Sequence, residues 1–173
     1  MTDTEDTADR AFTAIRGPWA GTPHHCDAPY WPTPEPLVEH MLDIAGVARG
    51  DHLIDLGCGD GRIVIAAAHR GASALGVDID PERIAEAEAA ARAAGVGHLA
   101  RFRCEDLFAT RLETASVVTL YLLPLPNQLL AARLRAELAP GSRVLSHAFA
   151  MRDWAPQVHE TIDRRELFLW VVD

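Results

Sequence analysis

The pattern of apolar and polar residues along this chain predicts strands and helices in regular alternation. Five short apolar runs predict strands, at residues 51–56, 74–78, 99–104, 116–123 and 143–147. Apolar residues at helical spacing predict helices at 36–45, 60–70 and 81–94, and a further helix through Leu129, Leu130, Leu134 and Leu138 that Pro140-Gly141 ends. The run at 116–123 is almost entirely apolar, which is typical of a central parallel strand buried on both faces.

The two ends of the chain depart from this alternation. Residues 1–22 are polar and acidic and predict a flexible N-terminal arm. Residues 23–173 predict one domain, which begins with an extended, proline-rich lead-in at residues 24–36. Residues 158–162 and 166–172 predict a closing hairpin. Only the eight residues 149–156 precede it, too few for a parallel crossover. We therefore expect an α/β fold, a doubly wound Rossmann-like parallel sheet that ends in an antiparallel hairpin and lacks the last crossover helix.

One segment carries most of the candidate chemistry, the sequence DLGCGDGR at residues 55–62. It lies between a predicted strand and a predicted helix, so its glycines make a turn whose backbone a ligand can approach closely. The helix that follows offers free N–H groups and a partial positive charge. The spacing G-x-G-x-G differs from the dinucleotide fingerprint G-x-G-x-x-G. Asp55 and Asp60 would repel a pyrophosphate, so they favour a ligand with an amine or sulfonium charge.

Acidic residues also follow the next two predicted strands. Asp78 lies 23 residues after Asp55, close to where an acid that binds a ribose is expected. Glu105 and Asp106 follow the third strand, and the two compete for the same role. Because ligands of such sheets bind outside the carboxyl ends of the strands, the three sites predict one binding edge. Acids in this order suit an adenosine with a charged amino-acid tail, which describes S-adenosylmethionine.

Composition limits the partners and the compartment. With 16 basic and 25 acidic residues the net charge is −9, so a nucleic-acid backbone is a poor partner and a basic protein or cationic small molecule fits better. Three scattered cysteines argue against a disulfide framework, and no apolar run reaches the length of a membrane span. The first residues are acidic where a signal peptide would be basic. We expect a cytoplasmic protein without a membrane partner, and the oligomeric state stays open.

Five stretches match a known pattern: PYWPTP at 29–34, DLGCGDGRIVI at 55–65, GVDID at 76–80, VVTLYLL at 117–123 with Asn127, and PGSRVLSH at 140–147. On these stretches the chain resembles class I S-adenosylmethionine-dependent methyltransferases over about residues 28–173. It is most similar to the small protein-lysine methyltransferases of archaea and the related mitochondrial lysine methyltransferases. The glycine motif indicates the superfamily alone, whereas the pairing of Y-x-P-T-P with S-H indicates the lysine group.

The resemblance implies roles for individual residues. Asp55 would lie near the methionine amino group of the donor, Asp78 would bind the ribose hydroxyls, and Asp106 would face the adenine amine. Tyr121 and His147 are the candidate catalytic residues, Tyr121 to orient the acceptor lone pair and His147 to receive a proton. The other expected contacts of S-adenosylmethionine, or of its product S-adenosylhomocysteine, are Tyr30, Thr33, Gly57, Gly59, Ile79, Leu107 and Leu122.

Several alternatives stay open at this point. The family commonly has an acid after Ser-His, whereas this chain has Ala148, and Leu125-Pro126 also departs from the pattern near the acceptor. Transfer to a protein lysine therefore competes with a small-molecule N- or O-methyltransferase acting on an amine or hydroxyl, and with a protein that binds the donor without transferring. His147 could equally be a hydrogen-bonded histidine at a strand end, and Tyr121 could simply pack in the strand.

Two other motifs favour structural explanations. The segment His24-His25-Cys26-Asp27 lacks the ligand spacing of zinc sites, so we expect no metal. Cys58 is expected to be a small residue of the turn rather than a nucleophile, because the motif places no base beside it.

Overall fold

A computed structural model describes residues 31–173 of the chain. The predictions for the arm at 1–22, the segment at 24–27 and Tyr30 lie outside the described residues. The strands are β1 (His52–Leu56), β2 (Ser73–Asp78), β3 (Ala100–Cys104), β4 (Val117–Leu120), β5 (Arg143–His147), β6 (Val158–Ile162) and β7 (Arg165–Val171). The helices of this part of the chain are α2 (Glu35–Ile44), α3 (Arg62–His69), α4 (Pro81–Ala93) and α5 (Pro124–Glu137).

The strands form one mixed sheet in the order β3-β2-β1-β4-β5-β7-β6. Neighbours among β1 to β5 are parallel, whereas β7 runs antiparallel to both β5 and β6. Residues 148–157, all of which are described, contain no helix, so the missing crossover and the closing hairpin are confirmed. Asp163 and Arg164 at the hairpin turn have φ angles of 49° and 63°, the left-handed backbone conformation that both central residues of a tight hairpin turn commonly adopt.

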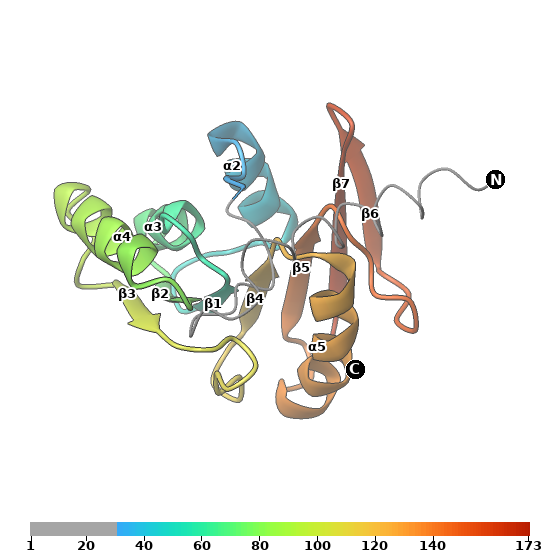
Figure 1. Ribbon diagram of the computed structural model, residues 1–173. Coiled ribbons are helices and arrows are strands. Elements are labelled where there is room, and N and C mark those ends of the chain that lie inside the picture. The colour runs from blue at the N-terminus through green and yellow to red at the C-terminus, as the bar shows by residue number, and fades with distance from the viewer. Residues whose placement is uncertain (1–30) are drawn as a thin grey trace, which may run out of the picture.

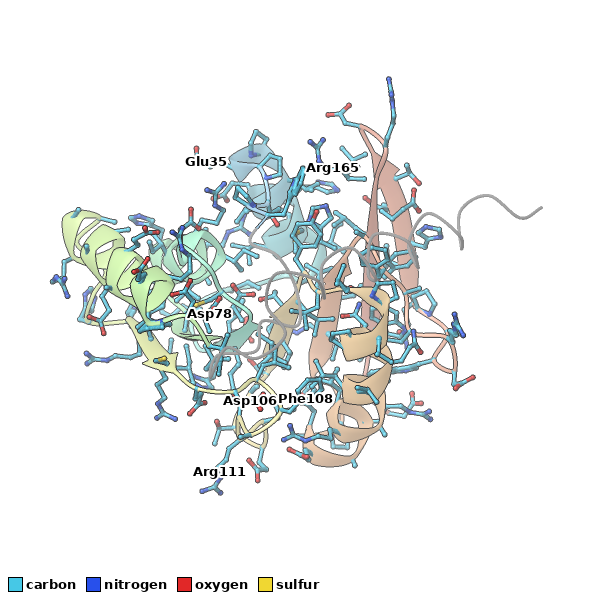
Figure 2. The ribbon with its side chains drawn as sticks, in the orientation of Figure 1. Glu35, Asp78, Asp106, Phe108, Arg111 and Arg165 are labelled. Atoms are coloured by element: carbon cyan, nitrogen blue, oxygen red, sulfur yellow. The ribbon has the colours of Figure 1, made fainter. Side chains whose placement is uncertain are left out.

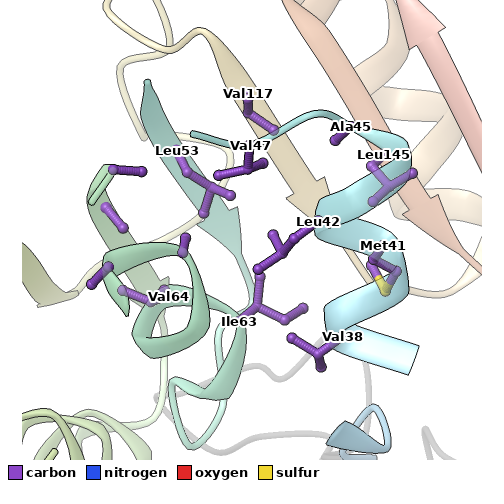
Figure 3. Close-up of a cluster of buried hydrophobic side chains, with 14 of the residues drawn as sticks. Val38, Met41, Leu42, Ala45, Val47, Leu53, Ile63, Val64, Val117 and Leu145 are labelled. Atoms are coloured by element: carbon purple, nitrogen blue, oxygen red, sulfur yellow. The ribbon is translucent and has the colours of Figure 1, made fainter. Parts of the chain in front are cut away.

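Helices cover both faces of the sheet (Figure 1). Helices α2, α3 and α4 lie on one face and α5 on the other. Strand residues alternate between the two sides, so Leu53 packs with Leu42 of α2 and Val64 of α3 (Figure 3). Ile54 instead joins Leu130 in the second core, under α5. None of the helices between residues 31 and 173 is long and apolar enough to cross a bilayer.

Local sequence explains where the helices begin and end. Asp80 caps α4 by accepting a 2.8 Å hydrogen bond from the Glu82 N–H, and Pro81 follows as the first helical residue. Helix α3 ends just before Gly71, which has a φ of 85°, a left-handed conformation that glycine adopts without strain.

Two of the predicted elements differ from the structure. The fourth strand was expected at 116–123 but ends at Leu120, because Pro124 and Pro126 start α5 and the chain must leave the sheet before them. The helix predicted from the spacing of Leu129, Leu130, Leu134 and Leu138 does not bury all four leucines, because Leu129 is 57% exposed. Leu130 and Leu134 are fully buried, so the apolar stripe of α5 runs beside Leu129 rather than through it.

The neighbouring leucines of α5 provide a test of this packing. We expect Leu130→Ala to lower the free energy of unfolding by about 2–5 kcal/mol, because it opens a cavity in the core. Leu129→Ala removes the same atoms from an exposed site in the same helix and should change it by no more than about 0.5 kcal/mol. Urea denaturation of the two variants measures both values, and equal losses would contradict the assigned helix orientation.

Candidate functional site

A buried carboxylate lies where β1 meets the glycine turn. Asp55 faces the same side of the sheet as Leu53 and pairs in register with Thr119 of β4. The Thr119 hydroxyl donates a 2.7 Å hydrogen bond to Asp55 Oδ1, and Asp55 is only 3% exposed. Burial raises the pKa of Asp55 to about 7, an effect that Thr119 opposes and the carboxylates of Asp78 and Asp60 reinforce. Such a group favours a cationic partner.

The glycine turn packs closely against its neighbours and adopts conformations that favour glycine. Gly57 has a φ of 81°, and a Cβ there would lie 2.9 Å from the Cδ2 atom of Leu122. Gly59 has a φ of 52°, and its N–H donates a 2.9 Å hydrogen bond to Asp78 Oδ2. The Asp80 N–H donates to the other oxygen of Asp78 at 3.0 Å. The Asp78 carboxylate is therefore fixed against the turn, at the end of the strand beside β1.

The other carboxylate of the turn is paired with an arginine. Both oxygens of Asp60, which was expected to favour a cationic ligand, bond to Arg62, at 3.0 and 3.1 Å from Nε. The Nη1 atom of Arg62 donates to the Thr33 carbonyl at 2.8 Å. This arginine, which the sequence analysis did not single out, connects the turn to the lead-in segment before α2.

The lead-in also reaches the end of β5. The Thr33 hydroxyl lies 3.1 Å from Nδ1 of His147, although 114 residues separate them in the sequence. The ring of Tyr121 lies against that of His147, with centroids 3.8 Å apart. Burial, and secondarily the positive charge of Arg165, lowers the pKa of His147 to about 4, so the imidazole is neutral near pH 7. Burial likewise raises the pKa of Tyr121, although the charge of Arg165 opposes this.

The third acidic site is more exposed than the first two. Asp106 lies in the segment after β3, and its Oδ1 accepts a 2.8 Å hydrogen bond from the Phe108 N–H (Figure 2). Leu107 beside it is half-buried. Glu105, the competitor of Asp106, instead accepts a 3.0 Å bond from the Thr110 hydroxyl. Asp106 is thus the acid of this pair with the greater solvent exposure.

The loop after β5 contains the departure from the family pattern. Ala148 has a φ of 74°, a conformation that a residue with a Cβ rarely adopts. Its N–H donates to the Glu166 carbonyl of β7 at 2.8 Å. Ser146, on the α5 side, accepts a 2.9 Å bond from Nδ2 of Asn127, whose Oδ1 is buried without a hydrogen-bond partner among the described residues.

The carboxyl edge thus collects most of the expected residues. Residues of β1, β2, β4 and β5 and the segment after β3 meet there, with Ile79 half-buried after β2 and Leu122 buried after β4. Sequence reasoning missed Thr119 and Arg62. Thr119 could have been found as a polar residue within an otherwise apolar strand. Arg62 could have been found because it is part of the glycine motif.

Metal and cysteine chemistry find no support within residues 31–173. That range has no group of three His, Cys, Asp or Glu side chains placed to hold a metal ion. Burial raises the pKa of the Cys58 thiol, and the nearby carboxylates of Asp55 and Asp78 raise it further. Cys58 therefore stays a thiol and serves as a small packing residue.

Comparison with known proteins places the chain in a family. The family model described as the ANTKMT methyltransferase domain matches residues 55–158. A protein-lysine N-methyltransferase of Saccharolobus islandicus is 46% identical over 131 residues, which are 75% of this chain and 81% of that protein. The adenine nucleotide translocase lysine N-methyltransferase of Mus musculus is 34% identical over 87% of this chain and 65% of that protein. The chain spans about half the length of a second mouse lysine N-methyltransferase that it matches.

A solved structure supports the same assignment. The crystal structure of an RNA methyltransferase from Salinibacter ruber, in complex with S-adenosyl-L-homocysteine, has a TM-score of 0.80 and 45% sequence identity. The match covers 82% of this chain and 94% of that one. With its glycine turn, three acidic strand ends and closing hairpin, this chain belongs to the ANTKMT methyltransferase domain family and is a class I S-adenosylmethionine-dependent methyltransferase.

Proposed function

We propose that this enzyme transfers the methyl group of S-adenosylmethionine to the side-chain amine of a protein lysine. The observation that carries the proposal is the contact between Thr33 and His147, 3.1 Å apart. These residues belong to Y-x-P-T-P and S-H, the two motifs whose pairing indicates the lysine group. They meet at the same carboxyl edge of the sheet as Asp55 and Asp78. The names of the archaeal and mouse relatives add support.

The residues at this edge fit the donor. Asp55 would hold the methionine amino group, because a buried carboxylate gains most from a cation placed beside it. Each oxygen of Asp78 accepts one backbone N–H, which leaves capacity for the ribose hydroxyls. Asp106 and Leu107 would face the adenine, and Gly57 would let the ligand approach the turn, with Gly59, Ile79, Leu122 and Thr33 lining the rest. When bound, the donor supplies an electrophilic methyl carbon on a sulfonium.

The acceptor end favours a neutral amine. A lysine side chain in water has a pKa of about 10.4 and must lose its proton before it can attack. Partial burial near Tyr121 and the positive charge of Arg165 would both disfavour the ammonium form of an acceptor lysine placed there. Tyr121 would orient the amine. His147 is neutral and could accept a proton, but a pKa of about 4 means that it would pass the proton on to water rather than keep it.

Small molecules and RNA are the other methyl acceptors to compare with a protein lysine. Ala148 stands where the family commonly has an acid, which favours a small-molecule amine or hydroxyl as the second candidate. The relative from Salinibacter ruber is named an RNA methyltransferase, whereas a net charge of −9 disfavours nucleic acid for this chain. We therefore place a basic protein first among the partners.

Asp55 should make donor binding depend on pH. A bound cation lowers its raised pKa, so affinity for S-adenosylhomocysteine, which retains the amino group, should fall as pH drops below about 7, by up to about tenfold per pH unit. Asp55→Asn should weaken binding and abolish this slope. Calorimetric titration from about pH 5.5 to about pH 8.5 measures both effects. The exposed Asp153→Asn is the control and should behave as wild type.

The same variant should stabilise the ligand-free protein. The folded pKa of Asp55 lies above the unfolded value, so its contribution to stability is present at low pH and is lost as pH rises through about 7. At about pH 8, Asp55→Asn should raise Tm by about 3 °C or more, the shift that about 1 kcal/mol makes in a domain of this size. At about pH 4 the two proteins should differ less. A lower Tm for the variant under the alkaline condition would refute the assigned burial cost.

Labelled donor identifies the acceptor. The enzyme is incubated with methyl-tritiated S-adenosylmethionine and, separately, with protein, RNA and small metabolites from a cell lysate. We expect label in protein, on lysine after acid hydrolysis. Asp78→Ala should eliminate it by preventing donor binding, while Tyr121→Phe should retain donor binding and reduce transfer. Label in RNA or metabolites alone would overturn the lysine proposal, and no label in any pool would leave a donor-binding protein.

A further inference from the structure

We infer that Arg62 is a positioning residue, which couples the donor-binding turn to the acceptor end of the site by holding Thr33 against His147. The inference deepens the proposed function and rests on it. Arg62 acts through the lead-in segment that precedes α2, which lies between the glycine turn and the end of β5.

The contacts form a continuous path across the site. At one end Arg62 forms a forked ion pair with Asp60, with Nη2 2.5 Å from Oδ2. Its Nη1 atom reaches the Thr33 carbonyl at 2.8 Å. The Thr33 hydroxyl then meets His147 Nδ1 at 3.1 Å, and the His147 ring lies against Tyr121. The planar guanidinium suits this bridge because its donors point at a carboxylate and a carbonyl at the same time.

Among residues 31–34 of the lead-in, backbone hydrogen bonds to secondary structure are made only by Pro34, whose carbonyl accepts from the Leu37 and Val38 N–H groups of α2. Residues 31–34 belong to neither a strand nor a helix, and Pro32 and Pro34 have no N–H to donate. Thr33 is nevertheless only 3% exposed, so its polar groups require partners. Arg62 supplies a partner for its carbonyl, and His147 supplies one for its hydroxyl. The position of the Thr33 hydroxyl, and with it the tautomer and orientation of His147, therefore depends on the arginine.

Simple stabilisation is a weaker explanation for this arginine. The forked pair of Arg62 and Asp60, whose side chains are 29% and 28% exposed, can contribute to folding by itself, but that contribution does not require the further bond from Arg62 to the Thr33 carbonyl. Misplacing a reacting group by about 1 Å, in contrast, can cost about 100-fold in rate. The bridge therefore matters mainly for geometry at the acceptor end.

Two substitutions interrupt the path at different links. Arg62→Met removes the bridge, and Thr33→Val keeps the carbonyl that Arg62 binds but removes the hydroxyl that meets His147. With lysate protein as acceptor and saturating labelled donor, each should lower the turnover rate by about 10- to 100-fold. The turnover rate of the double variant should fall no further than that of the slower single variant, because both substitutions act through one contact. If the two residues had independent roles, their fold-losses in rate would multiply. Arg62→Lys should recover part of the rate.

Arg143 offers a matched control. It also bridges a carboxylate, Asp51, and a backbone carbonyl, that of Ala45 at 2.7 Å, but at the opposite edge of the sheet. Arg143→Met should lower Tm as much as Arg62→Met or more, without lowering the turnover rate. If the two variants lose rate in proportion to their loss of Tm, Arg62 is merely structural and the inference fails.

A readout independent of turnover separates this inference from the proposed function. In ¹⁵N-labelled protein, the Nδ1 and Nε2 shifts of His147 report its tautomer, with His147→Gln to assign them. Arg62→Met and Thr33→Val should move these shifts in the same direction, and Arg143→Met should leave them unchanged. Unmoved shifts in Arg62→Met would overturn the inference even if wild type methylates lysine. Moved shifts without any lysine methylation would refute the proposed acceptor alone.

Discussion

The burial of one carboxylate constrains the whole site. Asp55 lies almost out of water, with the hydroxyl of Thr119 donating to it. An isolated buried charge is costly, so the group holds its proton up to about pH 7 unless a cation arrives. A ligand cation bound beside Asp55 would offset the free-energy cost of burying its charge. In the proposed role of Asp55, selectivity for a donor with a positive amino group would follow from a position whose charge is costly in the ligand-free protein.

The glycine turn and the lead-in complete the site around that carboxylate. Asp78 is held by backbone N–H groups of the turn, while Asp60 is paired with Arg62. Asp55 and Asp60 are close neighbours in the sequence and still have different environments, one buried beside a hydroxyl and one paired with an arginine. The difference comes from the neighbours that the fold provides, since Thr119 reaches one and an arginine reaches the other.

At the proposed acceptor end, around Tyr121 and His147, the geometry favours orientation over strong acid–base chemistry. A histidine with a lowered pKa and a tyrosine with a raised one are both neutral near pH 7, and their rings are in contact. Methyl transfer to an amine requires alignment and a dry environment more than a strong base. Ala148, in a left-handed conformation beside them, leaves this end without the acid common in the family.

Sequence by itself determined the alternation of strands and helices, the glycine turn, the acidic strand ends and the closing hairpin. These depend on local periodicity, on glycine and proline, and on the rule that parallel strands share an edge. Tertiary structure alone decided which side of α5 is buried, that Asp60 pairs with Arg62, and that Thr33 meets His147 across 114 residues. Thr33 and His147 belong to segments that only the fold brings together, and Asp60 pairs with Arg62 two residues away through side-chain geometry. Residue spacing along a single chain does not record which side chains meet in space.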